Sequence, residues 1–223
     1  KCLCGACDVW WHLSGAGDSM DRLAHSWSSF SFPMAVQYLK TIGHPSVNSK
    51  QMLVDILKQY AKGGNLSLID LGCGNAQLYE YCKDQKLACK YTGVDFSDPL
   101  LGAARMATAG DPAARFIKDD VNDLASIEGA YDVAIYSHVI EMLASPERSL
   151  LKAKTFSARI IIRFFEPPEF DTDTVELREM DVGDGRMVPY IRRKMSRDYY
   201  RLILTKMGCA GVDVYQDETA KDQ

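Results

Sequence analysis

The segment LIDLGCGNAQL, residues 68–78, holds the residues whose types and spacing most clearly suggest a binding chemistry. An apolar run ends at Asp70, and two glycines, Gly72 and Gly74, follow with one residue between them. Glycines at this spacing form a turn in which a nucleotide can approach the bare backbone. A dinucleotide site would have a third glycine where this chain has Gln77, and the Asp70 carboxylate would repel a pyrophosphate. The loop therefore favours a carrier with a cationic head group, such as a sulfonium or an ammonium.

Further acids follow the next two apolar runs of the chain. Asp95 comes about 20 residues after the glycine loop, which is the spacing of an acid that binds ribose hydroxyls. The pair Asp119 and Asp120 follows the third run. Each of these acids alone could cap a helix or lie solvated in a loop. Their order at successive strand ends favours one shared binding edge, because ligands of open α/β sheets bind where the strands end.

These residues need rigid elements to position them, and the chain from residue 66 onward predicts alternating strands and helices. Apolar runs predict buried strands at residues 66–71, 88–96, 114–120, 131–138 and 158–165. Helical patterns lie between them at residues 75–85, 97–107 and 145–156, and Ser97 can cap the second of these helices. Continuous apolar strands that alternate with helices indicate an α/β fold, a doubly wound, mostly parallel Rossmann-like sheet with helices on both faces.

The remaining segments predict additions to this sheet. Apolar residues at helical spacing predict an N-terminal helical cap, and Asp184-Gly185 predicts the turn of a small β-hairpin inserted after the fifth strand. A helix at residues 196–208 and a last strand at residues 211–216 are expected after the hairpin. We therefore divide the chain into three parts. A Cys-containing N-terminal segment covers residues 1–18, the helical cap covers residues 19–64, and the main domain covers residues 65–223, with the cap hairpin at residues 174–191.

Four segments, in order, resemble the motifs of the class I S-adenosylmethionine-dependent methyltransferases of the small-molecule type. The segments are LIDLGCGNA, VDFS, FIKDDVNDL and YDVAIYSHVIEML, and the resemblance covers roughly residues 50–165. One departure is Ala76, which takes the place of a third small residue. The resemblance implies a methyltransferase that uses S-adenosylmethionine as cofactor and releases S-adenosylhomocysteine. The scattered cysteines suit reduced thiols, so we expect a cytoplasmic location.

The resemblance also implies which residues bind this cofactor. Asp95 would bind the ribose, Asp120 and the backbone N–H of Val121 would contact the adenine edge, and the end of the fourth strand would lie beside the methionine portion. The implied cofactor-binding residues are Asp70, Gly72, Cys73, Gly74, Asp95, Phe96, Asp120, Val121 and Ser137.

Methyl transfer from a sulfonium is a direct in-line displacement, so holding donor and acceptor in line can supply much of the acceleration. A base is needed only if the acceptor, an N or O nucleophile, must lose a proton. His138 follows the fourth strand and is the first candidate for this base or for orienting the acceptor, since imidazole titrates near neutral pH. It could equally pack against the cofactor or bond to the backbone. Glu141 could bind an amine acceptor or serve the structure alone.

Four residues are candidates for contacts with the acceptor. Trp27 lies in the N-terminal cap, where it could cover the acceptor or simply pack in the core. Glu166 follows the fifth strand and could be an ordinary loop acid. Arg192 and Arg193 belong to a basic run that could be a solvated face or could grip a carboxylate or phosphate. The acceptor is thus a small molecule that could carry an anionic group.

Composition narrows the classes of function. The 223 residues are 47% hydrophobic with a net charge of −4, which argues against a nucleic-acid partner bound through its phosphates. No apolar run approaches the roughly 20 residues that span a bilayer, so no membrane partner is expected. Cys2, Cys4 and Cys7 with nearby His12 could form part of a zinc site, but no second ligand pair follows, and free thiols without a metal are the preferred interpretation.

Three alternatives stay open at this point. The chain could methylate RNA or protein, it could bind S-adenosylmethionine without catalysis, or it could be an NAD-dependent oxidoreductase, which Gln77 and Asp70 disfavour. Oligomeric state is open. The resembling family ends its sheet in an antiparallel pair of strands, whereas only one strand is evident here, at residues 211–216.

Overall fold

The computed structural model describes residues 22–41, 48–61, 63–164, 171–183 and 185–215, and the following description is confined to them. Its centre is a five-stranded sheet in the order β3-β2-β1-β4-β5, with every neighbouring pair parallel. The strands are β1 (Leu66–Leu71), β2 (Cys89–Asp95), β3 (Ala114–Lys118), β4 (Tyr131–Ser137) and β5 (Ser157–Arg163). The predicted fold class is confirmed, since β1, β2 and β4 are buried on both faces and all five strands pair in parallel.

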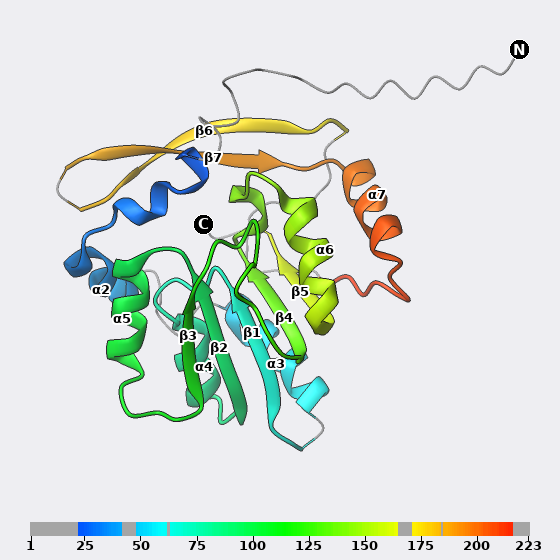
Figure 1. Ribbon diagram of the computed structural model, residues 1–223, viewed down its shortest axis with the longest axis horizontal. Coiled ribbons are helices and arrows are strands. Elements are labelled where there is room, and N and C mark those ends of the chain that lie inside the picture. The colour runs from blue at the N-terminus through cyan, green and yellow to red at the C-terminus, as the bar shows by residue number, and fades with distance from the viewer. Residues whose placement is uncertain (1–21, 42–47, 62, 165–170, 184, 216–223) are drawn as a thin grey trace, which may run out of the picture.

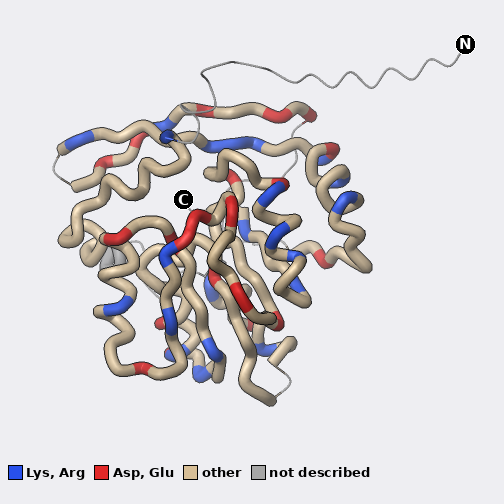
Figure 2. The backbone as a smooth tube through the Cα atoms, viewed as in Figure 1, with Lys and Arg blue, Asp and Glu red and all other residues tan. Residues whose placement is uncertain are grey.

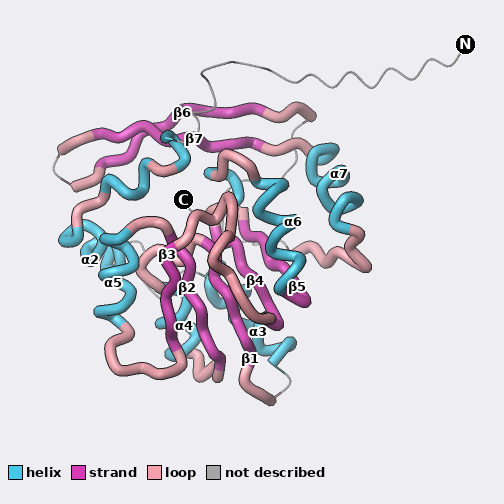
Figure 3. Tube along the Cα trace, viewed as in Figure 1, coloured by secondary structure: helices cyan, strands magenta, loops and turns pink. Residues whose placement is uncertain are grey.

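Helices cover both faces of this sheet (Figures 1 and 3). On one face, Leu53 and Leu57 of α3 (Asn48–Ala61) and Leu78 of α4 (Gln77–Asp84) pack with Leu68 of β1. On the other face, α6 (Pro146–Phe156) and α7 (Arg197–Met207) pack against side chains that alternate with the first set along the strands. The helix α5 (Asp98–Ala107) begins at Ser97, whose Oγ accepts a hydrogen bond from the N–H of Leu100, as predicted.

An antiparallel hairpin, β6 (Thr174–Asp181) with β7 (Met187–Lys194), lies over the carboxyl ends of the strands (Figure 1). The prediction of a hairpin after the fifth strand is confirmed, and β7 runs three residues past the predicted end. Arg193 ties the hairpin to the sheet, because its Nε and Nη2 donate to the carbonyls of Leu143 and Ala144 at 2.9 Å each. These carbonyls follow the short helix η2 (Ile140–Met142), which in turn follows β4.

The N-terminal part of the described chain also reaches this edge. The short helix η1 (Ser26–Ser29) lies against β7, where the Ser26 hydroxyl donates to the carbonyl of Pro189. The helix α2 (Phe32–Thr41) packs against α5. The helix α3, by contrast, belongs to the main core, so the segment predicted as a helical cap contributes to two layers of the molecule.

One sequence prediction is wrong. The last strand expected at residues 211–216 is not formed over its described part, residues 211–215, which have no regular secondary structure. Val212 and Val214 are exposed there, so the alternation that suggested a half-buried strand has no sheet face to cover in the described part of the chain. No helix in the described ranges combines the length and the apolar character that crossing a membrane would need.

Candidate cofactor and acceptor site

The glycine loop between β1 and α4 adopts the backbone that its sequence requires. Gly72, Gly74 and Ala76 all have positive φ, at 80°, 54° and 64°. A Cβ on Gly72 would come within 2.5 Å of Val139 Cγ2, whereas a Cβ on Gly74 would meet nothing within 4 Å. The first glycine therefore allows close packing, and the second presents open backbone to a ligand.

Asp95 holds this loop in place from the end of β2. One carboxylate oxygen accepts from the N–H of Gly74 and the other from the N–H of Ser97, both at 2.9 Å. Burial raises the pKa of Asp95, and these N–H donors oppose the rise by stabilising the charged form. The two loops that follow β1 and β2 are thus joined through one buried carboxyl group.

Asp70 is a second buried acid, located just before the loop. It is 3% exposed and accepts a hydrogen bond of 2.7 Å from the Tyr91 hydroxyl. Burial, with a smaller contribution from the Asp95 charge, raises the pKa of Asp70 to about 7, although the Tyr91 hydrogen bond opposes the shift. Burial and these two acids also raise the pKa of the Cys73 thiol well above its ordinary value, so this cysteine is a neutral packing residue. A cation beside Asp70 would favour its charged form.

The predicted adenosine contacts come together beyond β2 and β3, and a residue that the sequence did not single out joins them. His25 Nε2 lies 2.9 Å from an oxygen of Asp120, and the His25 ring meets the Phe96 ring edge to face at 4.8 Å. The other Asp120 oxygen accepts from the N–H and the side-chain amide of Asn122. Val121 is buried, and its carbonyl accepts from the hydroxyl of Ser149.

The end of β4 brings the predicted methyl-transfer residues beside the glycine loop, since Val139 packs against Gly72. His138 has a positive φ of 57°, and its N–H donates to the carbonyl of Arg163 at 2.9 Å. Ser137 Oγ accepts from Arg163 Nη1 at 3.2 Å. A non-glycine residue held at positive φ beside a binding loop is a frequent property of functional positions.

Glu141 lies one turn further, in η2, and is only 2% exposed. Its charge raises the pKa of the Tyr200 hydroxyl, although burial is the larger cause. The carboxyl group therefore faces the interior between η2 and α7. This placement favours the structural role that the sequence left open for Glu141.

The predicted acceptor contacts have three different outcomes. Trp27 faces the hairpin, with its ring 6.1 Å from Tyr190 and 5.5 Å from Phe30. Arg193 donates two hydrogen bonds to backbone carbonyls, so its observed role is to position the hairpin. Binding of an acceptor by Arg193, or by the half-buried Arg192, stays a prediction. Glu166 lies outside the described residues, as do Cys2, Cys4 and Cys7.

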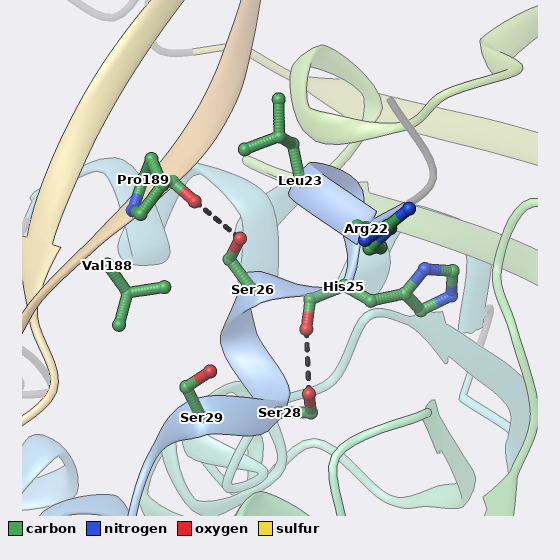
Figure 4. A pocket seen from close by; sticks show the side chains of 8 residues that line it. All are labelled: Arg22, Leu23, His25, Ser26, Ser28, Ser29, Val188 and Pro189. Carbon is green, nitrogen blue, oxygen red and sulfur yellow. Dashed lines mark hydrogen bonds between the residues drawn. The ribbon is translucent and has the colours of Figure 1, made fainter. Parts of the chain in front are cut away.

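Two hollows open beside the hairpin. The larger, of about 620 Å³, lies between η1 and β7 and is lined by Arg22, Leu23, His25, Ser26, Ser28, Ser29, Val188 and Pro189. Figure 4 shows Ser26 directed at Pro189, while the His25 ring extends away from the hairpin. This hollow does not include the glycine loop, so the backbone geometry of that loop is the better guide to the cofactor site. In the described ranges no group of three or more His, Cys, Asp or Glu could hold a metal ion.

Sequence reasoning missed His25, Lys50 and Arg163. The signals were present but weak, because a single His just before a short helix and a Lys in a first turn occur in many proteins without a role. Lys50 is 9% exposed, and its Nζ donates to Gln77 Oε1 at 3.1 Å, which a sequence pattern could not reveal.

Comparison with known proteins agrees with this geometry. Residues 69–156 match the family described as "Methyltransferase domain". A SAM-bound amino pentose methyltransferase from Micromonospora echinaspora, involved in calicheamicin biosynthesis, superposes with a TM-score of 0.56 at 13% identity, over 78% of this chain and 87% of that one. A plantazolicin methyltransferase in complex with a triazolic desmethyl analogue and SAH gives 0.55 at 14% identity, over 87% of this chain and 75% of that one. At these identities the likeness concerns the fold.

A curated relative is 26% identical over 185 residues, an uncharacterized 37.1 kDa protein in transposon TN4556 of Streptomyces fradiae. The match covers 77% of this chain, and the chain spans about half of that relative's length, 52%. Fold and sequence match define the same class. Over residues 69–156 the chain thus resembles a methyltransferase domain, in agreement with the predicted enzyme class and its cofactor.

Proposed function

We propose that this chain transfers a methyl group from S-adenosylmethionine to a small-molecule acceptor with an N or O nucleophile. The observation that carries the proposal is the glycine loop. Asp95 holds this loop beside the ends of β2 and β4, and Gly74 has open space on its Cβ side. Two of the structural neighbours are named as an amino pentose methyltransferase and a plantazolicin methyltransferase, which supports a small acceptor. The hairpin and η1 support it too, because they cover the edge of the sheet.

S-adenosylmethionine supplies an electrophilic methyl group on a sulfonium. The charged form of Asp70 would favour binding of the sulfonium. Asp95 would accept hydrogen bonds from the ribose hydroxyls while it also holds the glycine loop in place. His138 would accept the proton of the nucleophile or orient it, from the end of β4. Trp27 and Tyr190 would form the apolar wall of the acceptor site. We also propose that the chain divides after residues 18 and 64, that the protein is cytoplasmic, and that the acceptor carries an anionic group.

The test is an assay of S-adenosylhomocysteine release with a panel of small amines, hydroxy acids and amino sugars. We expect turnover with a subset of these acceptors. Turnover confined to RNA or protein substrates would contradict the small-molecule part of the proposal, and binding without turnover on any substrate would favour a non-catalytic domain.

His138→Asn examines the proposed base, because Asn tolerates positive φ and so retains the backbone. We expect turnover to fall by about 100-fold or more, the lower range of general acid–base catalysis, with the cofactor affinity unchanged. The proposal gives Ser28 no role, so Ser28→Ala, on the exposed side of η1, is the matched control. Full activity of the His138 variant would remove this residue from the chemistry.

A further inference from the structure

Lys50 is a buried cation for which the proposed mechanism gives no use. It lies in the first turn of α3 at the carboxyl edge of the sheet, is 9% exposed, and donates to Gln77 Oε1 at the first residue of α4. Burial is the main cause that lowers its pKa, and the second cause is the positive charge of Arg163. Burying an ammonium is costly unless an anion compensates it. Among the residues that the structure describes, the ionic neighbour that shifts its pKa is the cation Arg163.

The register of α3 against β5 explains why these two cations meet. Arg159 of β5 lies over the ring of Tyr60 near the end of α3, at 4.7 Å, and Ile161 packs on the same core as Leu53. From Tyr60 to Lys50 the helix spans about 15 Å, and from Arg159 to Arg163 the strand spans about 13 Å. Since strand side chains alternate, Arg163 continues the face of Arg159 and Ile161 and comes level with Lys50.

The surroundings of this pair face the proposed methyl position. Arg163 Nη1 donates to Ser137 Oγ, and the Arg163 carbonyl accepts from the N–H of His138. Gln77, which Lys50 contacts, opens α4 directly after the glycine loop, so the N-terminal end of that helix adds a partial positive charge. Two cations and a helix start thus meet beside the ends of β1, β4 and β5.

We propose that Lys50 and Arg163 form a subsite for a carboxylate at the methyl-donor end of the active site. A guanidinium offers paired donors that match a carboxylate, and an ammonium adds a point charge from the other side. The carboxylate has two sources, the amino-acid portion of the donor or the acceptor itself. The inference rests on the proposed function, because it places the donor on the glycine loop.

The experiment compares calorimetric titrations of wild type, Lys50→Met and Arg163→Met with two ligands. S-adenosylhomocysteine has the carboxylate, and 5′-methylthioadenosine lacks the amino-acid portion. If the donor supplies the carboxylate, we expect each variant to bind S-adenosylhomocysteine about 10- to 100-fold more weakly and 5′-methylthioadenosine as wild type does. The control is Lys58→Met, which removes an exposed cation from the same helix and should change neither affinity.

If the acceptor supplies the carboxylate, both affinities stay unchanged and the KM for the active acceptor rises by a similar factor in the two variants. Unchanged affinities together with an unchanged acceptor KM would overturn the subsite. An equal loss for both ligands would overturn it as well, because the side chains would then only support the fold, which thermal unfolding of the variants would report. If wild type binds neither ligand, the proposed function fails before the subsite is reached.

Discussion

The two halves of the sheet's carboxyl edge differ in the charged residues that they carry. After β2 and β3 the sequence places acidic residues, namely Asp98, Asp119, Asp120 and Asp123. Figure 2 shows acidic positions in red near the carboxyl ends of the strands. On the side of β4 and β5, Lys50 and Arg163 approach the edge from α3 and β5, and β7 above carries Arg192 and Arg193. An adenosine offers hydroxyl and amino donors, which need acceptors, and an amino acid offers a carboxylate, which needs a cation. This difference in charge suggests how the methyl donor is oriented, with its adenosine on the acidic half and its amino-acid portion on the basic half.

The two halves also differ in how their polar groups are engaged. On the acidic side, Asp95 and Asp120 already accept hydrogen bonds from the N–H groups of Gly74, Ser97 and Asn122. On the basic side, Lys50 donates to the amide oxygen of Gln77, and the positive charge of Arg163 helps to lower its pKa. The acidic half is therefore arranged before a ligand arrives, and the basic half places a buried ammonium near the charge of Arg163.

The largest expected effect concerns the glycine loop at the boundary of the two halves. Gly72→Ala would place a Cβ 2.5 Å from Val139 Cγ2 at a φ of 80°, so we expect the free energy of unfolding to fall by about 2–5 kcal/mol. Gly74→Ala also has positive φ but no neighbour within 4 Å, and should lose about 1–2 kcal/mol. Chemical denaturation measures both values.

The two glycine variants distinguish a packing role for Gly72 from a ligand-binding role for Gly74. Because Gly74 presents its open side to the cofactor, Gly74→Ala should stay folded and lose affinity for S-adenosylhomocysteine. If Gly72→Ala is as stable as wild type, or Gly74→Ala binds as wild type does, the assignment of the two glycines is wrong.

The next prediction concerns Asp70, between the two halves. Its pKa is raised in the folded protein from an ordinary value of 3.8 to about 7. The folded state thus binds more protons than the unfolded state in this window, and the contribution of Asp70 to stability falls as pH rises from about 4 to about 7. A sulfonium favours the carboxylate, so affinity for S-adenosylmethionine should increase with pH up to about 7 and then level off.

S-adenosylhomocysteine has no sulfonium and is the control ligand for this titration. We expect the affinity ratio of the two ligands to change by up to about tenfold per pH unit below neutrality. Asp70→Asn should remove this dependence. A constant ratio between pH 5 and about 8 in wild type would show that Asp70 does not respond to the cation.

The smallest effect is expected at His25, on the acidic side. Its Nε2 is hydrogen-bonded to one carboxylate oxygen of Asp120, so an adenine amino group would compete with His25 for that oxygen. We expect His25→Ala to bind S-adenosylhomocysteine up to about fivefold more tightly, the range of one hydrogen bond of about 1 kcal/mol. Calorimetry measures this change, and a tenfold loss would instead make His25 a direct contact of the ligand.

Much of the fold was predictable from local signals in the sequence. The apolar runs of β1 and β4 stay buried on both faces, so their composition predicts a parallel sheet without knowledge of their neighbours. The segment around Val212 and Val214 has the same alternation as a strand, yet whether such a segment joins a sheet depends on a partner that its own residues do not encode.

The site was predictable only where the chain itself places residues at strand ends. Asp95 and Asp120 follow strands directly, so topology brings them to one edge. Lys50 and Arg163 meet because α3 runs beside β5, and His25 reaches Asp120 across 95 residues of sequence. Such contacts depend on tertiary packing, and no spacing in the sequence contains them.

The central claim is that the glycine loop and Asp95 bind a methyl donor. Calorimetric titration of wild type and Asp95→Ala with S-adenosylmethionine, S-adenosylhomocysteine and NAD tests it most directly. We predict that wild type binds both sulfur compounds and little NAD, and that Asp95→Ala loses about 1.5–3 kcal/mol of binding free energy for each charge-assisted hydrogen bond removed. Tight binding of NAD with no response to either sulfur compound, or an unchanged affinity of Asp95→Ala, would contradict the account.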